Sequence, residues 1–215
     1  MKPLCAILRD QRAGSAAEFA LVLPLLLIFL LGIIDVGRLL WTVNRVEKAT
    51  QMGVRYAIVT TPIPAGLSNS SSKVSAVGLT DSTGHVLTNG DSLDQYVMGT
   101  ATYTGTSGTA APTCTPSANC SALGATVTTS FDAIYNRMKL FVPSLQRTSV
   151  QVSYSNSGLG YAGDPTGRDF YPVVTVSIQN FTFSPISLAV FKSTFALRTI
   201  SAALTMEDGQ GTASN

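Results

Sequence analysis

Few residues in this chain have the types and spacing that catalysis requires. His85 is the single histidine and has no obvious acid or nucleophile partner in the sequence, so a Ser-His-acid triad would depend on it alone. Walker, HExxH and GxSxG motifs are absent. A surface or turn histidine is therefore favoured over a catalytic one. We expect no enzyme activity and no catalytic residues.

A glycine motif offers a second candidate chemistry. The segment Gly158-Leu-Gly-Tyr-Ala-Gly163 matches the GxGxxG pattern of dinucleotide-binding loops. That pattern binds a pyrophosphate only where it joins a strand to a helix in a βαβ unit. The surrounding sequence predicts no such unit, so we expect no dinucleotide site and no cofactor.

Two cysteines frame a short loop of seven residues, Cys114-Thr-Pro-Ser-Ala-Asn-Cys120. Such close spacing in a Ser/Thr-rich segment favours a local disulfide in an oxidising compartment over two free thiols. Closing so short a loop would stabilise the fold by roughly 2 kcal/mol. No second Cys or His pair is present to complete four metal ligands, so a metal site is not expected.

The remaining charged residues of interest border an apolar run. Phe19 to Ile34 is sixteen residues without a polar side chain, which is about 24 Å of helix. Flanking residues complete the ~30 Å of a bilayer core. Glu18 precedes the run and is either a helix-start residue at headgroup level or a contact to another subunit. Pro24 removes one backbone donor from the helix.

Asp35 and Arg38 follow the run at a spacing of three, which allows them to pair on one helix face. Two interpretations of the Asp35–Arg38 pair remain open: pairing at the bilayer edge and a specific contact to another subunit. Beyond them, small or apolar residues continue in steps of four and three, which predicts one helix from about Ala16 to Val59. A break at Gly53 is the alternative. The residues of this stripe are Leu39, Val43, Val46, Thr50, Gly53 and Ala57.

Composition indicates an exported protein rather than a cytosolic enzyme. Charged residues make up only 12% of the chain, about half the usual share. Residues 61–215 hold seven Lys/Arg and eight Asp/Glu, a net charge of −1, so nucleic-acid binding has no electrostatic support. We divide the chain into a leader (1–14), a transmembrane and core stem helix (15–60) and an exported α+β domain (61–215) with Ser/Thr/Gly-rich loops at 61–124.

Periodicity predicts the elements of the exported domain. Helical spacing marks Ser130–Phe141, and alternation marks strands at Ser149–Tyr154, Val173–Phe183 and Phe195–Met206. Shorter strand-like pieces occur at Lys73–Leu79, His85–Leu87 and Tyr96–Tyr103. The second half of the stem helix would cover the apolar face of the sheet. The expected fold is α+β, a long N-terminal transmembrane helix continuing into a C-terminal antiparallel β-sheet domain.

The N-terminal residues resemble a known family. Gly-Ser-Ala-Ala-Glu-Phe-Ala-Leu-Val-Leu-Pro, the following Leu/Ile run, Gly-Ile-Ile-Asp-Val-Gly-Arg and Met52-Gly-Val-Arg-Tyr-Ala57 are similar to segments of TadE-like proteins. These are pseudopilins, or minor pilins, of the tight-adherence (Flp-type) pilus machinery. The resemblance implies a type IV pilin-like fold and a role in assembly or initiation of such a pilus.

The resemblance also implies partners and a processing site. A prepilin peptidase would cut between Gly14 and Ser15, and the stem would contact other pilins through Glu18, Phe19 and Pro24. Glu18 is fourth after this cut, whereas the family usually places its acid fifth; a cut after Ala13 would restore that spacing but lose the glycine.

The expected location is the bacterial inner membrane, crossed once. Because the leader is basic, its N-terminus would be cytoplasmic, and the C-terminal domain would be periplasmic or extracellular. The lipid bilayer, other pilins or pseudopilins and the pilus assembly platform are the expected partners. An anchored periplasmic scaffold or binding protein that never enters a fibre is the alternative. A membrane-tethered hydrolase would need His85.

Overall fold

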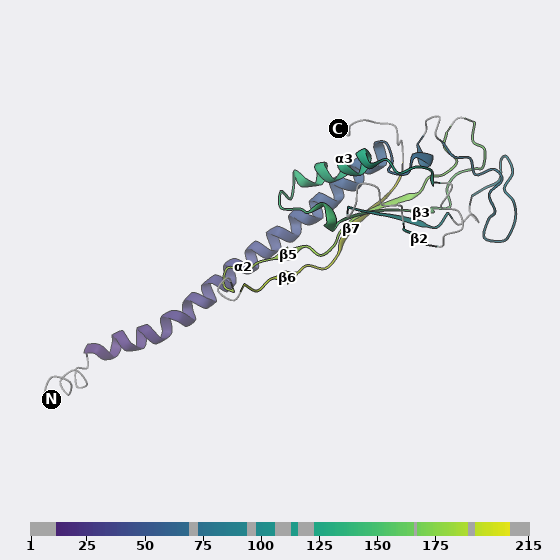
Figure 1. The fold of residues 1–215 in the computed structure, drawn as a ribbon. Coiled ribbons are helices and arrows are strands. Elements are labelled where there is room, and N and C mark those ends of the chain that lie inside the picture. The colour runs from purple at the N-terminus through teal and green to yellow at the C-terminus, as the bar shows by residue number, and fades with distance from the viewer. Residues whose placement is uncertain are drawn as a thin grey trace. The chain divides into compact units, whose positions relative to one another are not determined.

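A computed structural model describes residues 12–68, 73–93, 98–105, 113–115, 123–165, 167–188 and 192–206 (Figure 1). The chain forms two compact units. One comprises the residues up to Val43 together with Thr182–Phe195, and the other comprises Asn44–Phe181 and the residues from Ala196 onward. The boundary falls inside a helix, and the first unit includes a segment from near the C-terminal end of the chain.

The longest element is helix α2, Arg12–Val59. It begins four residues before the expected Ala16 and ends at the expected Val59. Pro24 lies inside it without ending it. At the C-terminal end, the backbone N–H and the hydroxyl of Thr60 both donate to the Tyr56 carbonyl, at 3.1 and 2.7 Å. Pro62 then prevents the helix from continuing.

The second unit, which we call the sheet unit, contains a five-stranded antiparallel sheet in the order β2-β1-β3-β4-β7. Its central strands follow the predicted alternation: β3 buries Val150, Val152 and Tyr154, and its neighbour β4 buries every second residue from Val174. The strands are β1 (Thr100–Thr104), β2 (Thr113–Thr115), β3 (Val150–Ser155), β4 (Val173–Ile178) and β7 (Ile200–Thr205).

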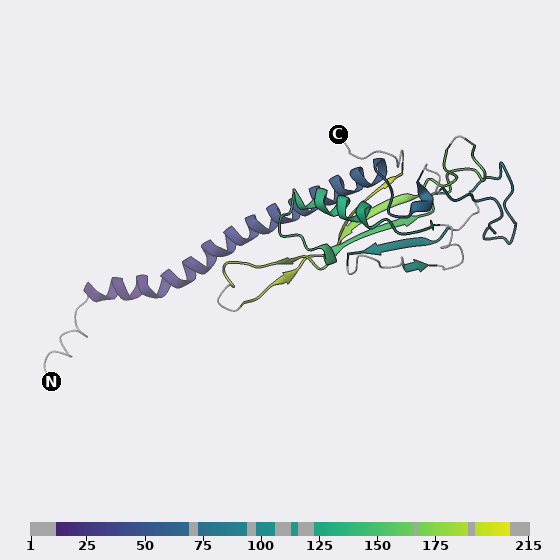
Figure 2. The ribbon, with the colours of Figure 1, turned by 45° about the horizontal axis from the view of Figure 1, so that its top comes forward.

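Two helical segments cover one face of this sheet (Figure 2). One is α3, Thr128–Lys139, close to the predicted 130–141. The other is residues 44–59 of α2, whose stripe residues Val46, Thr50, Gly53 and Ala57 are buried. A Cβ on Gly53 would lie 2.8 Å from Met138 Cγ and 3.3 Å from Val176 Cγ1. The expected cover of the sheet by the second half of the helix is therefore present, and the helix does not break at Gly53.

Some predicted strands are wrong. Residues 73–79 and 85–87 form no strand, and only an isolated bridge joins Thr80 to Val86. The reason is local: the Asp81 carboxylate accepts the N–H groups of Thr83 and His85, so the backbone closes a turn instead of a ladder. The predicted 173–183 strand is also interrupted, because Asn180 adopts a positive φ of 53°.

That interruption separates β4 from a second, two-stranded sheet formed by β5 (Thr182–Phe183) and β6 (Phe195–Ala196). We call residues 182–196 the β5–β6 hairpin. Apart from Ala196 it belongs to the first unit, with the N-terminal part of α2.

Candidate functional site

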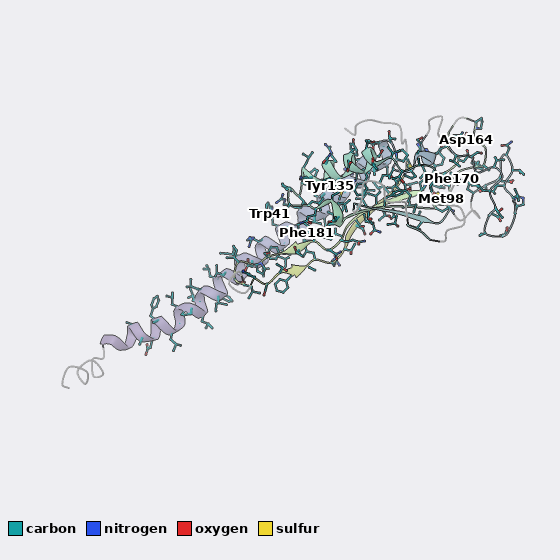
Figure 3. All side chains as sticks on the ribbon, viewed as in Figure 1. Trp41, Met98, Tyr135, Asp164, Phe170 and Phe181 are labelled. Carbon is teal, nitrogen blue, oxygen red and sulfur yellow. The ribbon has the colours of Figure 1, made fainter. Side chains whose placement is uncertain are left out.

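Residues 16–34 of α2 form a stretch that is apolar except for Glu18 and that the described chain leaves largely uncovered, with Leu31 and Gly32 alone half-buried. Its large side chains project from the helix (Figure 3), and Phe19 is 65% exposed. Among the described residues one helix, Ala16–Val59, is long and apolar enough to cross a membrane, and 6% of its most apolar window is buried. A soluble core helix would bury one face of such a stretch, so this helix is consistent with a single-pass membrane anchor.

The predicted contact residues Glu18, Phe19 and Pro24 all lie at the start of this stretch. Glu18 and Phe19 are exposed, and within the described part of the chain no side chain pairs with the Glu18 carboxylate. Pro24 has no N–H to donate to the carbonyl of Ala20, one helical turn earlier. The stretch therefore offers one carboxylate and one free acceptor to a neighbouring molecule.

The predicted processing site lies in the first turn of α2. Gly14 is exposed, and a Cβ added to it would meet nothing within 4 Å. Ser15 is helical. Residues 1–11 lie outside the described residues, so the leader remains a sequence prediction.

The structure brings Asp35 and Arg38 together. Arg38 Nη1 donates to Asp35 Oδ1 at 3.0 Å, and the Arg38 Cζ atom lies 5.4 Å from the centroid of the Phe183 ring on β5. Asp35 is 6% exposed although it lies on a helix whose neighbours are exposed. Its burial has a cause that the sequence did not reveal.

The cause is the β5–β6 hairpin. The N–H of Ile186 donates to Asp35 Oδ1 and that of Ser187 donates to Asp35 Oδ2, both at 2.7 Å. We call this arrangement the Asp35 clamp. A carboxylate that accepts two backbone donors and one guanidinium is fully satisfied. The residue types of Ile186 and Ser187 gave no signal for it, because backbone N–H groups make most of the contact, to which the Ser187 side chain adds a further hydrogen bond.

The loop that carries the glycine motif binds an anionic group of the same chain, the carboxylate of Asp169. The Asp169 carboxylate, fully buried, accepts the N–H of Gly163 at 2.8 Å and that of Asp164 at 3.2 Å. It also accepts from Ser75 Oγ and Ala76 N at 3.0 and 2.7 Å. The donors that a phosphate would need are therefore occupied. The motif lies between β3 and β4, which pair antiparallel, and the described residues between these strands contain no helix, so the motif is not part of a βαβ unit.

Two further points of the sequence analysis concern metal binding and a disulfide. No group of three or more His, Cys, Asp or Glu side chains could hold a metal ion in the described part of the chain. The disulfide prediction lies outside the described residues, because Cys120 is not among them and only the backbone of Cys114, in β2, is described. The disulfide therefore stays a prediction.

An α+β protein with an N-terminal transmembrane-like helix is the class that this fold and this apolar stretch define. Residues 14–55 match the family described as TadE-like protein. The match covers the apolar stretch and the Asp35–Arg38 pair and extends into the buried half of α2. It confirms the resemblance seen in the N-terminal motifs and indicates involvement in the Tad pilus system. No curated protein and no solved structure matches the chain.

Proposed function

We propose that this chain is a membrane-anchored pseudopilin that takes part in the assembly or initiation of a Tad/Flp-type pilus. The observation that carries the proposal is the uncovered apolar stretch. Its nineteen residues, 16–34, span about 28 Å of helix, close to the ~30 Å of a bilayer core. In the inner membrane the stretch would be covered by lipid, and in a fibre by the stems of neighbouring subunits.

Glu18 and Pro24 support a role in contacts between stems. A carboxylate near an apolar run is costly in lipid, and its cost falls when a cationic group of a neighbour pairs with it. The free acceptor opposite Pro24 is tolerated in membrane helices when a neighbour satisfies it. Both features favour a stem that packs against other pilins, pseudopilins or the assembly platform.

Processing by a prepilin peptidase between Gly14 and Ser15 is part of the proposal. The cut would fall in the first turn of α2, so the peptidase would have to open that turn. Opening is easy there because helix ends fray at low free energy and nothing in the described chain packs against Gly14. The basic leader would lie in the cytoplasm, and the sheet unit in the periplasm or outside the cell.

The test is site-specific photo-crosslinking in cells that build the pilus. A photoreactive residue at Leu30, half-exposed in the apolar stretch, should crosslink to pilins or to the assembly platform. The substitution Glu18→Ala should abolish most of these crosslinks. Glu47→Ala, which removes a carboxylate from the same helix outside the apolar stretch, should leave them unchanged.

Crosslinks that persist unaltered in Glu18→Ala would favour an anchored scaffold that never enters a fibre. The processing step has its own readout. Mass spectrometry of the purified protein should find Ser15 at the N-terminus. An intact Met1 in cells with an active prepilin peptidase would contradict cleavage.

A further inference from the structure

A cleft lies at the N-terminal end of α3, beside the C-terminal end of α2, within the sheet unit. Its volume is about 190 Å³, and we call it the α3 cleft. None of the described residues that line it is charged. They are Tyr56, Thr60, Thr61, Val127, Thr129, Ser130 and Ala133. The cleft is therefore bordered by hydroxyl groups and by the first turn of a helix.

The first turn of α3 has backbone donors that the described chain leaves unused. Val127 is the N-cap, and its apolar side chain makes no capping hydrogen bond. The N–H of Ser130 donates to the Val127 carbonyl at 3.2 Å. The N–H groups of Thr128 and Thr129 have no acceptor among the described residues. First-turn N–H groups point out of the helix end, and the helix dipole makes this end partially positive, so it favours an anion.

Ser130 supplies a further donor that is independent of the helix end. Its side chain is 8% exposed and lines the α3 cleft. Within the part of the chain that the structure describes, its hydroxyl has no hydrogen-bond partner. A hydroxyl withdrawn from bulk water without a partner is unfavourable, and a ligand that accepts from it lowers that cost. The cleft thus combines an unpaired hydroxyl with unpaired backbone donors.

This set of donors fits a carboxylate better than a phosphate. A carboxylate carries one charge on two oxygens, so one oxygen can accept from the first-turn N–H groups and the other from the Ser130 hydroxyl. Phosphate groups are commonly bound by Arg or Lys, and no cationic side chain is among the described residues of the lining.

We propose that the α3 cleft binds a carboxylate group, supplied either by a free organic acid or by an acidic side chain of another polypeptide. In this site the Ser130 hydroxyl and the N–H groups of Thr128 and Thr129 hold the carboxylate. The proposal depends neither on the membrane span nor on pilus assembly, because every residue of the site belongs to the sheet unit.

Solution NMR of the full chain in nanodiscs tests the proposal with three probes at equal ionic strength. Acetate represents a free carboxylate, N-acetylglutamate amide represents an acidic side chain, and inorganic phosphate is the comparison. Acetate should shift the amide signals of Thr128 and Thr129 saturably, and phosphate should bind more weakly. Tighter binding of N-acetylglutamate amide than of acetate would identify a polypeptide as the source, and equal or weaker binding would identify a free acid.

Two substitutions each remove one donor and keep the helix. Ser130→Ala removes the hydroxyl and raises helix propensity. Thr128→Pro removes one N–H at the first helical position, where proline is favoured, and the preceding Val127 is already extended, as proline requires. Each should weaken acetate binding about tenfold, the loss expected for one hydrogen bond to a charged group. Asn136→Ala, which removes an exposed polar side chain from the same helix, should leave binding unchanged.

Three results would contradict the proposal. The absence of a saturable shift in the unsubstituted chain would overturn it, because the donors would then be bonded to water alone. Binding that survives both Ser130→Ala and Thr128→Pro unchanged would overturn it as well, because the carboxylate would then lie elsewhere. Phosphate binding as tight as acetate binding would overturn the assignment to a carboxylate.

Discussion

Gly53 of α2 lies directly against Met138 of α3, and the absence of a side chain at Gly53 is what lets the two helices approach. A Cβ at this position would lie 2.8 Å from Met138 Cγ and 2.9 Å from its Sδ, and Met138 is fully buried. The contact explains why a residue that weakens helices stands in the middle of one.

Gly53→Ala should destabilise the sheet unit. The gain in helix propensity is about 1 kcal/mol, whereas overpacking a buried contact costs about 1–3 kcal/mol, so a small net loss is expected. Denaturant unfolding of the full chain in detergent, followed by circular dichroism, measures it. In a Met138→Ala background the same substitution should become stabilising. Gly37→Ala, with nothing within 4 Å of its Cβ, should not destabilise; a loss there as large as at Gly53 would contradict the packing explanation.

Asp35→Ala should release Ile186 and Ser187 of the β5–β6 hairpin from α2. The N–H groups of Ile186 and Ser187 each lose a charged acceptor, and hydrogen bonds to charged groups contribute about 1.5–3 kcal/mol. Their amide hydrogens should exchange at least about tenfold faster, as measured by NMR in nanodiscs. Arg38→Ala keeps both acceptor oxygens and should have a smaller effect. The amide of Met206, bonded to Pro172, is the internal control and should not change.

Alkaline pH should unfold the sheet unit through its buried tyrosines. Burial raises the pKa of both Tyr103 and Tyr154 above the ordinary value, because the phenolate cannot be hydrated inside the core. The folded state keeps protons that the unfolded chain releases near pH ~10, so stability is full below that pH and falls as pH rises beyond it. Melting temperatures measured from neutral to strongly alkaline pH should show this loss.

The two tyrosines should differ when substituted by phenylalanine. The Tyr154 hydroxyl accepts the N–H of Ile63 at 3.2 Å, so Tyr154→Phe leaves a buried donor unsatisfied and should cost about 1–3 kcal/mol. The Tyr103 hydroxyl is buried with no partner among the described residues, so Tyr103→Phe should be neutral or stabilising. Both variants should show a shallower alkaline loss. An equal cost at neutral pH would contradict the assignment.

Asp169→Ala should disrupt the loops around the glycine motif. Four donors would lose their acceptor, among them the buried N–H of Ala76, and removing one member of a buried charged network costs about 3–5 kcal/mol. Asp132→Ala is the matched control, because its ion pair with Arg147 at 2.8 Å is half-exposed and such pairs contribute at most about 1 kcal/mol. Thermal unfolding of both variants gives the comparison.

The sequence predicted those elements whose side chains carry a clear period. The stripe from Val46 to Ala57 marks the buried face of α2 because helical spacing alone decides which residues share a face. The alternation around Val152 and Val176 marks β3 and β4, because residues two apart in a strand share a face of the sheet. The end of α2 follows from Pro62, which forbids a further turn.

The parts that the sequence did not predict depend on backbone groups or on polar residues. The strand-like piece predicted at Tyr96–Tyr103 overlaps β1 (Thr100–Thr104), but β2 is only Thr-Cys-Thr, which is too short and too weakly alternating to be separated from a loop. The split between β4 and β5 depends on the backbone conformation of Asn180. The Asp35 clamp uses the N–H groups of Ile186 and Ser187, and every residue type except proline has one.

The Asp35 clamp also sets an order of events during synthesis. Asp35 and Ile186 are 151 residues apart in the chain. At about 5–20 residues per second, the ribosome needs roughly 8–30 s to proceed from one to the other. During that interval the carboxylate must rely on Arg38, water or another protein for its hydrogen bonds. Asp35 is thus a carboxylate whose environment reports whether the chain has been completed and folded.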